Sequence, residues 1–162
     1  MELPLEKRFK MMSQILRATH FEWRRAALAF CPDADPKELV MKFWEEVGHD
    51  TADAYLKQLD PEKPLPKQMA QNTVFSSLCM GEDAKVVEGK DEKESFVRHD
   101  GCPWYDWHKR LGLEEEDQAG CDHWFRTFTK DINEKLNTDI KWETQKCLAA
   151  GDDQCLRRFW VE

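Results

Sequence analysis

The fold is indicated most clearly by the stretch IKWETQKCLAAGDDQCLRRFWV, which runs from Ile140 to Val161. Two runs that contain β-branched and aromatic residues flank Gly151-Asp152-Asp153, a combination typical of a turn between strands. The stretch therefore predicts an antiparallel hairpin with strands over residues 140–149 and 154–161.

Two helices are predicted immediately before this hairpin. Pro103 suits the first position of a helix, and Gly112 suits its end, just after Leu111. The second helix is predicted over residues 117–136.

Short runs of β-branched and aromatic residues precede these helices, separated by Gly81 and Gly89. They indicate strands of a meander over residues 73–80, 84–88 and 95–99. For the first run the alternative is a helix over residues 69–80.

The first third of the chain predicts helices. Apolar residues recur at intervals close to helical spacing from Leu5 to Phe30. Asp35 then suits the N-cap of a second helix, with Pro36 at its first position. We expect Gly48 to end that helix and a shorter helix to follow over residues 50–59.

Residues 60–67 contain three prolines and are not expected to form regular structure. About 60 residues of helix would make a poor core alone, so we predict a single domain over residues 1–162. It comprises a helical layer (residues 1–60) and an α+β core (residues 68–162). The fold class is α+β, with the N-terminal helical layer packed on a mainly antiparallel sheet and two further helices inserted before the C-terminal hairpin.

Composition excludes several kinds of partner. The 162 residues include 24 basic and 32 acidic side chains, which gives a formal net charge of −8. This balance argues against nucleic acid and against an anionic membrane as partners. The N-terminal residues lack a signal-peptide core, so we expect a cytoplasmic protein whose thiols stay reduced.

Six cysteines are the main chemical feature of the sequence. We interpret Cys31 and Cys79 as structural. Cys102 comes directly before Pro103 and so lies at a predicted helix cap, where the helix dipole favours a thiolate. His99 is three residues upstream. This pair is a candidate nucleophile or ligand, and the alternative is a buried cap residue.

Cys121 lies on the core-facing side of its predicted helix. At about 100° per residue, it shares one stripe with Phe125, Phe128 and Ile132. His123 points about 200° away from Cys121 on the same helical wheel, so the two make a weak ligand pair.

The hairpin supplies further candidate ligands. Glu143 and Cys147 have the same parity along their strand, which predicts that they share a face. A turn of three or five residues brings Cys155 to that face, and a turn of two residues places it opposite. With Cys121 above the sheet, these residues would make a thiolate-rich set that favours zinc, or iron. The alternative is a set of unrelated buried thiols.

Three motifs resemble one known family. The turn Cys102-Pro103-Trp104, the pair Cys121-Asp122 and the hairpin segment Gly151-Asp-Asp-Gln-Cys155 are similar to those of the L-2-amino-thiazoline-4-carboxylic acid hydrolase-like proteins. The resemblance covers roughly residues 95–160. The sequence departs from the family after Cys155, where Leu156 and Arg157 stand in place of an acidic and an aromatic residue.

The hairpin also resembles the 4-vinyl reductase type of small-molecule-binding domain, which is related to the sensor domains of phenol-responsive activators. Those sensors hold zinc with one Cys, one Glu and two further Cys. The resemblance implies that Cys121, Glu143, Cys147 and Cys155 are the metal ligands here, although the spacing from Glu143 to Cys147 is one residue longer.

The resemblances imply two functions. The first is a metal-dependent hydrolase of C–N bonds that acts on a small cyclic or amide-like substrate. In it a metal would activate water, His99, Asp122 or His123 would transfer protons, and Cys102 is an alternative nucleophile. The second is a binding or sensing module with a structural zinc or iron ion. For both functions the expected partner is a small molecule, and the sequence also allows a homodimer.

Overall fold

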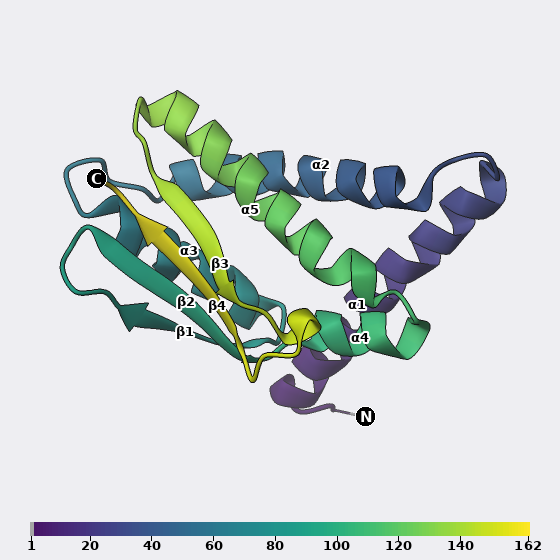
Figure 1. Ribbon diagram of the computed structural model, residues 1–162. Coiled ribbons are helices and arrows are strands. Elements are labelled where there is room, and N and C mark those ends of the chain that lie inside the picture. Colours follow the sequence, from purple (N-terminus) through teal and green to yellow (C-terminus); the bar gives the residue numbers. More distant parts are fainter. Residues whose placement is uncertain (1) are drawn as a thin grey trace.

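The computed structural model describes residues 2–162, which form five α-helices, one short 3-10 helix and four strands (Figure 1). In chain order the elements are α1 (Leu5–Phe30), α2 (Pro36–Leu56), α3 (Leu65–Cys79), β1 (Asp83–Glu88), β2 (Glu94–Gly101), α4 (Pro103–Leu111), α5 (Glu114–Leu136), β3 (Lys141–Lys146), η1 (Leu148–Ala150) and β4 (Cys155–Trp160).

The four strands form one sheet in the order β1-β2-β4-β3, and every neighbouring pair is antiparallel. The last strand therefore lies inside the sheet, between β2 and β3, as Figure 1 shows. This arrangement confirms the predicted α+β class, with N-terminal helices and a C-terminal hairpin. It also means that β4 has hydrogen-bonded neighbours on both sides.

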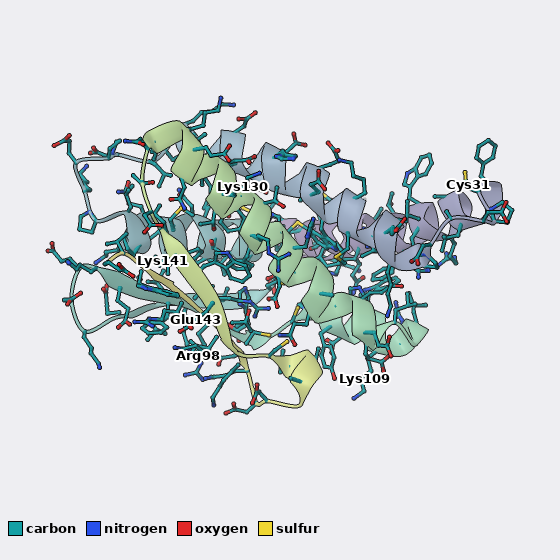
Figure 2. The ribbon with its side chains drawn as sticks, turned by 45° about the horizontal axis from the view of Figure 1, so that its top comes forward. Cys31, Arg98, Lys109, Lys130, Lys141 and Glu143 are labelled. Atoms are coloured by element: carbon teal, nitrogen blue, oxygen red, sulfur yellow. The ribbon has the colours of Figure 1, made fainter. Side chains whose placement is uncertain are left out.

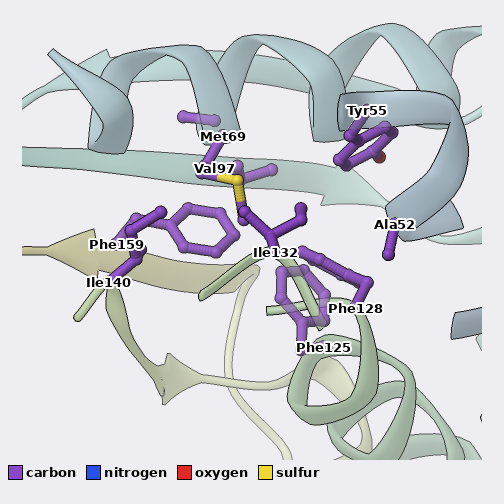
Figure 3. Packing of buried hydrophobic residues seen from close by; sticks show 10 residues of the cluster. Ala52, Tyr55, Met69, Val97, Phe125, Phe128, Ile132, Ile140 and Phe159 are labelled. Carbon is purple, nitrogen blue, oxygen red and sulfur yellow. The ribbon is translucent and has the colours of Figure 1, made fainter. Parts of the chain in front are cut away.

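One face of the sheet carries the core. Alternate residues of β4 are buried, which is the pattern of a strand with one face against helices. Side chains from α2, α3 and α5 pack on that face around Phe159 (Figure 3). The buried cluster comprises Ala52, Tyr55, Met69, Ala70, Val97, Phe125, Phe128, Ile132, Ile140 and Phe159.

Helices α1 and α2 form the long N-terminal hairpin of helices. Asp35 caps α2 as predicted, because its carboxylate accepts hydrogen bonds from the backbone N–H of Lys37 at 2.7 Å and of Glu38 at 3.3 Å. Along α1, large apolar side chains stay exposed in the single chain. They are Leu5, Phe9, Met11, Met12, Ile15, Leu16, Trp23 and Phe30.

The predicted helix end at Gly48 is wrong, because α2 continues through this residue to Leu56. Gly48 instead allows α2 and α5 to approach closely, since a Cβ added there would lie 2.6 Å from Cβ of Thr127. Gly120 on α5 has the reciprocal role, since its added Cβ would lie 2.5 Å from the Trp44 ring. Glycine is required at this helix crossing for space and not for a turn.

The strand predicted over residues 73–80 is also wrong, and the helical alternative is confirmed by α3. This helix begins at Leu65, inside the proline-rich segment that was expected to be irregular. Pro66 lies in its first turn, where the missing N–H leaves no hydrogen bond unmade.

The C-terminal hairpin is present with shorter strands than predicted. A long connection over residues 147–154, which includes η1, joins β3 to β4. A register shift between Thr144 and Lys146 interrupts the pairing of β3 with β4. Such a bulge changes which face the following residues occupy.

No helix within residues 2–162 is both long and apolar enough to cross a membrane.

The close approach of α2 and α5 generates a stability prediction. Gly48→Ala should lower the free energy of unfolding by about 1–3 kcal/mol, because the new methyl group must displace Thr127. This loss should outweigh the gain in helix propensity, which is about 1 kcal/mol. Chemical denaturation monitored by circular dichroism measures the change.

Asp53→Ala is the control, since Asp53 is exposed on the same helix and should change stability by no more than about 0.5 kcal/mol. A Gly48→Ala variant that is more stable than the native chain would contradict the crossing described here.

Candidate functional site

A cavity of about 840 Å³ lies between the N-terminal helices, α5 and one end of the sheet. Its walls are mostly aromatic and apolar, and all five α-helices contribute to them. Trp44, Trp104 and Trp124 are among the lining residues. A few polar side chains reach the same space from the strands and from the loop after α3, so the cavity combines an apolar surface with a small polar end.

His99 is the central polar group of that end. It lies on β2 facing the helices, and its Nε2 is 2.9 Å from Oγ of Ser77 and 3.1 Å from Oε2 of Glu82. Because a carboxylate only accepts hydrogen bonds, we assign the proton to Nε2. Nδ1 is buried without a hydrogen-bond partner among the described residues. One nitrogen of the ring is thus held by a carboxylate and the other is free.

Cys155 lies directly opposite His99 in the pairing of β2 with β4, and both line the cavity. Its sulfur accepts a hydrogen bond from the backbone N–H of Leu148 at 3.4 Å. A hydrogen bond from the Cys147 thiol lowers the pKa of Cys155, and the positive charge of Arg157 lowers it further, against the opposing effect of burial. The partner thiol shifts the other way, since the same hydrogen bond raises the pKa of Cys147.

Among the charged side chains of the site, Arg157 is the most completely buried. It lies two residues beyond Cys155 on β4, faces the same side, and is 3% exposed. Its Nη2 is 3.3 Å from Sγ of Cys121 and 3.9 Å from Oδ1 of Asp122, and its guanidinium stacks over Phe125. Burial lowers the pKa of Arg157, but the nearby thiols of Cys121 and Cys155 raise it by more.

Cys102 also lines the cavity, directly before α4 as predicted. The expected lowering of its pKa is wrong, because burial and the carboxylate of Glu82 raise the pKa of this thiol. These two effects outweigh the hydrogen bond from the backbone of Tyr105. The helix end alone does not make this cysteine a thiolate.

Asp122 and His123 do not line the cavity. Asp122 accepts a hydrogen bond from Oγ1 of Thr144 at 2.7 Å and so joins α5 to β3. His123 lies on the other side of α5, with its Nε2 3.8 Å from Glu45. His99 and Cys102 therefore line the same cavity, and these two candidates lie outside it.

The predicted metal ligands do not converge. Cys121 and Cys155 both lie close to Arg157, and Cys147 lies beside Cys155. Glu143 is on the outer face of the sheet, opposite Arg158, to which its carboxylate is joined by an ion pair at 3.3 Å (Figure 2).

The prediction that Glu143 and Cys147 share a face is wrong because the bulge after Thr144 reverses the alternation before Cys147 is reached. Within residues 2–162, no group of three or more His, Cys, Asp or Glu side chains is placed to hold a metal ion. The guanidinium of Arg157 lies next to the thiol of Cys121, with Nη2 3.3 Å from Sγ. The residues present do not fit the expected four-ligand set, and binding of zinc or iron stays a prediction.

The remaining two cysteines are exposed. Cys31 lies at the tip between α1 and α2 (Figure 2), and Cys79 is the last residue of α3. Cys79 contributes to the outer wall of the cavity, which its interpretation as a structural residue did not anticipate.

Sequence reasoning missed three polar groups of the site, namely Arg157, Glu82 and Ser77. A signal existed for Arg157, because it is two residues from Cys155 and a strand returns to the same face with that period. Glu82 and Ser77 carried no such signal. They reach His99 only because α3 packs against β2 and its C-terminal end lies beside that strand.

The fold and site define an α+β domain that encloses a small-molecule-sized cavity between its helices and an antiparallel sheet. The chain belongs to the family described as L-2-amino-thiazoline-4-carboxylic acid hydrolase, whose model matches residues 8–159. Among the curated proteins, no sequence matches it.

Two solved structures are similar to the chain. A trafficking protein particle complex subunit 3 from Naegleria fowleri, covalently bound to palmitic acid, has a TM-score of 0.57 and 18% identity over 94% of this chain and 96% of its own. The phenol-responsive sensory domain of the transcription activator PoxR, with phenol, has a TM-score of 0.55 and 12% identity over 89% of this chain and 73% of its own. At these identities the similarity shows the fold alone.

The buried guanidinium generates a second stability prediction. Arg157→Met should lower the free energy of unfolding by about 2 kcal/mol, because it removes the hydrogen bond to Cys121 and the contact with Phe125. Arg158→Met is the matched control, since Arg158 is the next residue and pairs with Glu94 on the outer face, where the loss should be smaller. Equal losses in urea unfolding of the two variants would count against a structural role for Arg157.

His20 generates a pH prediction. Burial, the nearby His108 and Arg24 lower the pKa of this cavity-lining residue to about 4 from 6.5. The unfolded chain therefore takes up a proton at higher pH than the folded chain. Stability should fall as the pH drops from about 6.5 towards about 4, with no contribution above that window.

Melting temperatures across this window test the prediction. His20→Gln cannot titrate, so its melting temperature should fall less steeply with decreasing pH than that of the native chain. Parallel curves for the two proteins would show that His20 does not titrate as described.

Proposed function

We propose that the chain is a hydrolase that opens a C–N bond of a small cyclic or amide-like substrate held in the cavity. The observation that carries this proposal is the state of His99, a cavity-lining residue with one ring nitrogen bound to the carboxylate of Glu82 and the other without a hydrogen-bond partner among the described residues. The hydrolase description of the family gives the reaction class its support.

His99 is suited to act as a general base. Glu82 accepts from Nε2–H at 3.1 Å, which fixes the tautomer and stabilises the ring when it becomes protonated. Nδ1 then has the lone pair that can take a proton from water or from a thiol. The side chains of His99 and Glu82 are 9% and 11% exposed, so bulk water does not compete strongly for this pair.

The cavity suits a small ring. Its volume of about 840 Å³ lies within the usual range of about 300–1,000 Å³ for small-molecule sites. Aromatic walls such as Trp44 and Trp104 would exclude water around a bound ring and strengthen the electrostatic interactions at the polar end. Since the four predicted ligands do not converge, no step of this proposal is assigned to a metal ion.

A second candidate function is the binding or sensing of a small apolar molecule without turnover. The apolar character of the cavity walls favours it, as does the similarity to a sensory domain crystallised with phenol. Four tryptophans line the cavity, so occupancy by phenol should quench intrinsic fluorescence.

A turnover assay tests the hydrolase proposal. Incubation with L-2-amino-thiazoline-4-carboxylic acid, the compound in the family's description, should give a product heavier by one water, detected by mass spectrometry. His99→Asn and Glu82→Gln should each lower kcat, by about 10²–10⁴-fold for His99, because the base is lost or misplaced.

His123→Asn is the control, since His123 lies outside the cavity and its loss should leave kcat unchanged. Full activity in His99→Asn would contradict the role of this base. Saturable quenching by phenol, with no hydrolysis of this or related cyclic amidines, would favour the sensing function instead.

A further inference from the structure

We propose that Cys155 is the nucleophile of this site, that His99 is its general base, and that Glu82 positions the base. The inference rests on the proposed hydrolytic function, and it assigns this role to Cys155 in place of Cys102, the alternative nucleophile that the sequence suggested.

The register of the sheet brings the first two groups together. His99 and Cys155 are directly opposite each other on the antiparallel strands β2 and β4, with both side chains on the inner face. Side chains at opposed positions have Cβ atoms about 4.5–5.5 Å apart. Both residues are buried and both line the cavity, so a substrate bound there can touch the sulfur and the ring together.

The hydrogen bonds of His99 leave the appropriate nitrogen for Cys155. Nε2 is occupied by Glu82 and Ser77, whereas Nδ1 is buried and has no partner among the described residues. A thiol, an imidazole and a carboxylate in this order form the arrangement that activates cysteine nucleophiles. The three groups come from β4, β2 and the loop after α3, so no local sequence motif records them.

Two further groups suit the sulfur to this role. The backbone N–H of Leu148 donates to Sγ at 3.4 Å. Arg157 adds a positive charge on the same face of the strand, and its Nε–H is buried with no hydrogen-bond partner in the described chain. Arg157 lines the cavity together with Cys155, so its guanidinium is placed to stabilise negative charge that develops on the substrate.

Cys102 lacks these partners. It lies beyond the end of β2, outside the pairing with β4 that ends at His99 and Cys155. Burial and the charge of Glu82 both disfavour its thiolate. The structure thus gives Cys102 and Cys155 opposite surroundings.

The reaction balances with water as the only co-reactant. Cys155 transfers its proton to Nδ1 of His99, and its sulfur bonds to the electrophilic carbon of a cyclic amidine or amide, whose π electron pair moves to the nitrogen or oxygen. The electron pair on that nitrogen or oxygen then re-forms the double bond to carbon while the ring bond breaks. The ring atom that leaves the carbon takes the proton from His99. A thioimidate or thioester remains on Cys155. Water gives a proton to His99 and adds to this carbon, and the sulfur leaves and regains the proton.

The covalent intermediate provides the test. Acid quenching of native protein during turnover of L-2-amino-thiazoline-4-carboxylic acid should trap an adduct on the peptide that contains Cys155. Cys155→Ser and Cys155→Ala should each lose at least about 10³-fold in kcat. Cys102→Ser should stay within about tenfold of the native chain. Circular dichroism of each variant shows whether it is folded.

A second arm needs no substrate turnover. Iodoacetamide at limiting concentration, quantified peptide by peptide, should alkylate Cys155 faster than Cys102 in the native protein, and His99→Asn should slow the reaction of Cys155 by about tenfold or more. An adduct on Cys102, or a Cys155→Ser variant with more than a tenth of native activity, would overturn the assignment while the hydrolase function stands. If no substrate is turned over, the proposed function fails. If His99→Asn leaves the alkylation rate of Cys155 unchanged, the pairing of Cys155 with His99 is overturned as well.

Discussion

The antiparallel pairing of β4 with β2 and β3 is the constraint on which the rest of the structure depends. It fixes which side chains of the last strand face the helices, namely Cys155, Arg157 and Phe159. The last of these completes the core, and the first two form the polar end of the cavity. A slip of one residue would place all three in solvent and bring Arg158 inward. Folding energy and site geometry are therefore specified by the same register.

Much of the fold follows from local sequence signals. Residues close together in the sequence specify three of its features. These are the hairpin around Gly151, the start of the helix at Pro103 and the helix cap at Asp35. Gly48 was misassigned because a glycine that ends a helix and a glycine that lets two helices touch look identical in one sequence. The difference lies in Thr127, almost 80 residues away, which occupies the space that a side chain would fill.

The candidate site was predicted in part. The helical wheel turned Cys121 towards the core, where it packs, and His99 was singled out by its nearness to Cys102. The face of Cys155 stayed open between two turn lengths, and the structure places it inside. The bulge after Thr144 could not be seen in the sequence, so Glu143 was placed on the wrong face. The partners of His99 depend on how α3 packs beside β2, which no spacing rule records.

The buried thiols of the site surround one cation, the guanidinium of Arg157. Arg157 lies where thiols from α5 and from the hairpin meet, with Sγ of Cys121 at 3.3 Å and the carboxylate of Asp122 at 3.9 Å from Nη2. A buried guanidinium needs such partners, since an unpaired charge in this position would be costly. The hydrogen bond from the Cys147 thiol lowers the pKa of Cys155, and the charge of Arg157 lowers it further.

The position of the proton on the His99 ring directly tests whether His99 is the general base for Cys155, because both proposed roles depend on it. Long-range ¹H–¹⁵N correlation spectra of ¹⁵N-labelled protein at neutral pH distinguish the two neutral tautomers. We expect a proton on Nε2, shared with Glu82, and an unprotonated Nδ1. A proton on Nδ1 with a bare Nε2 would contradict it.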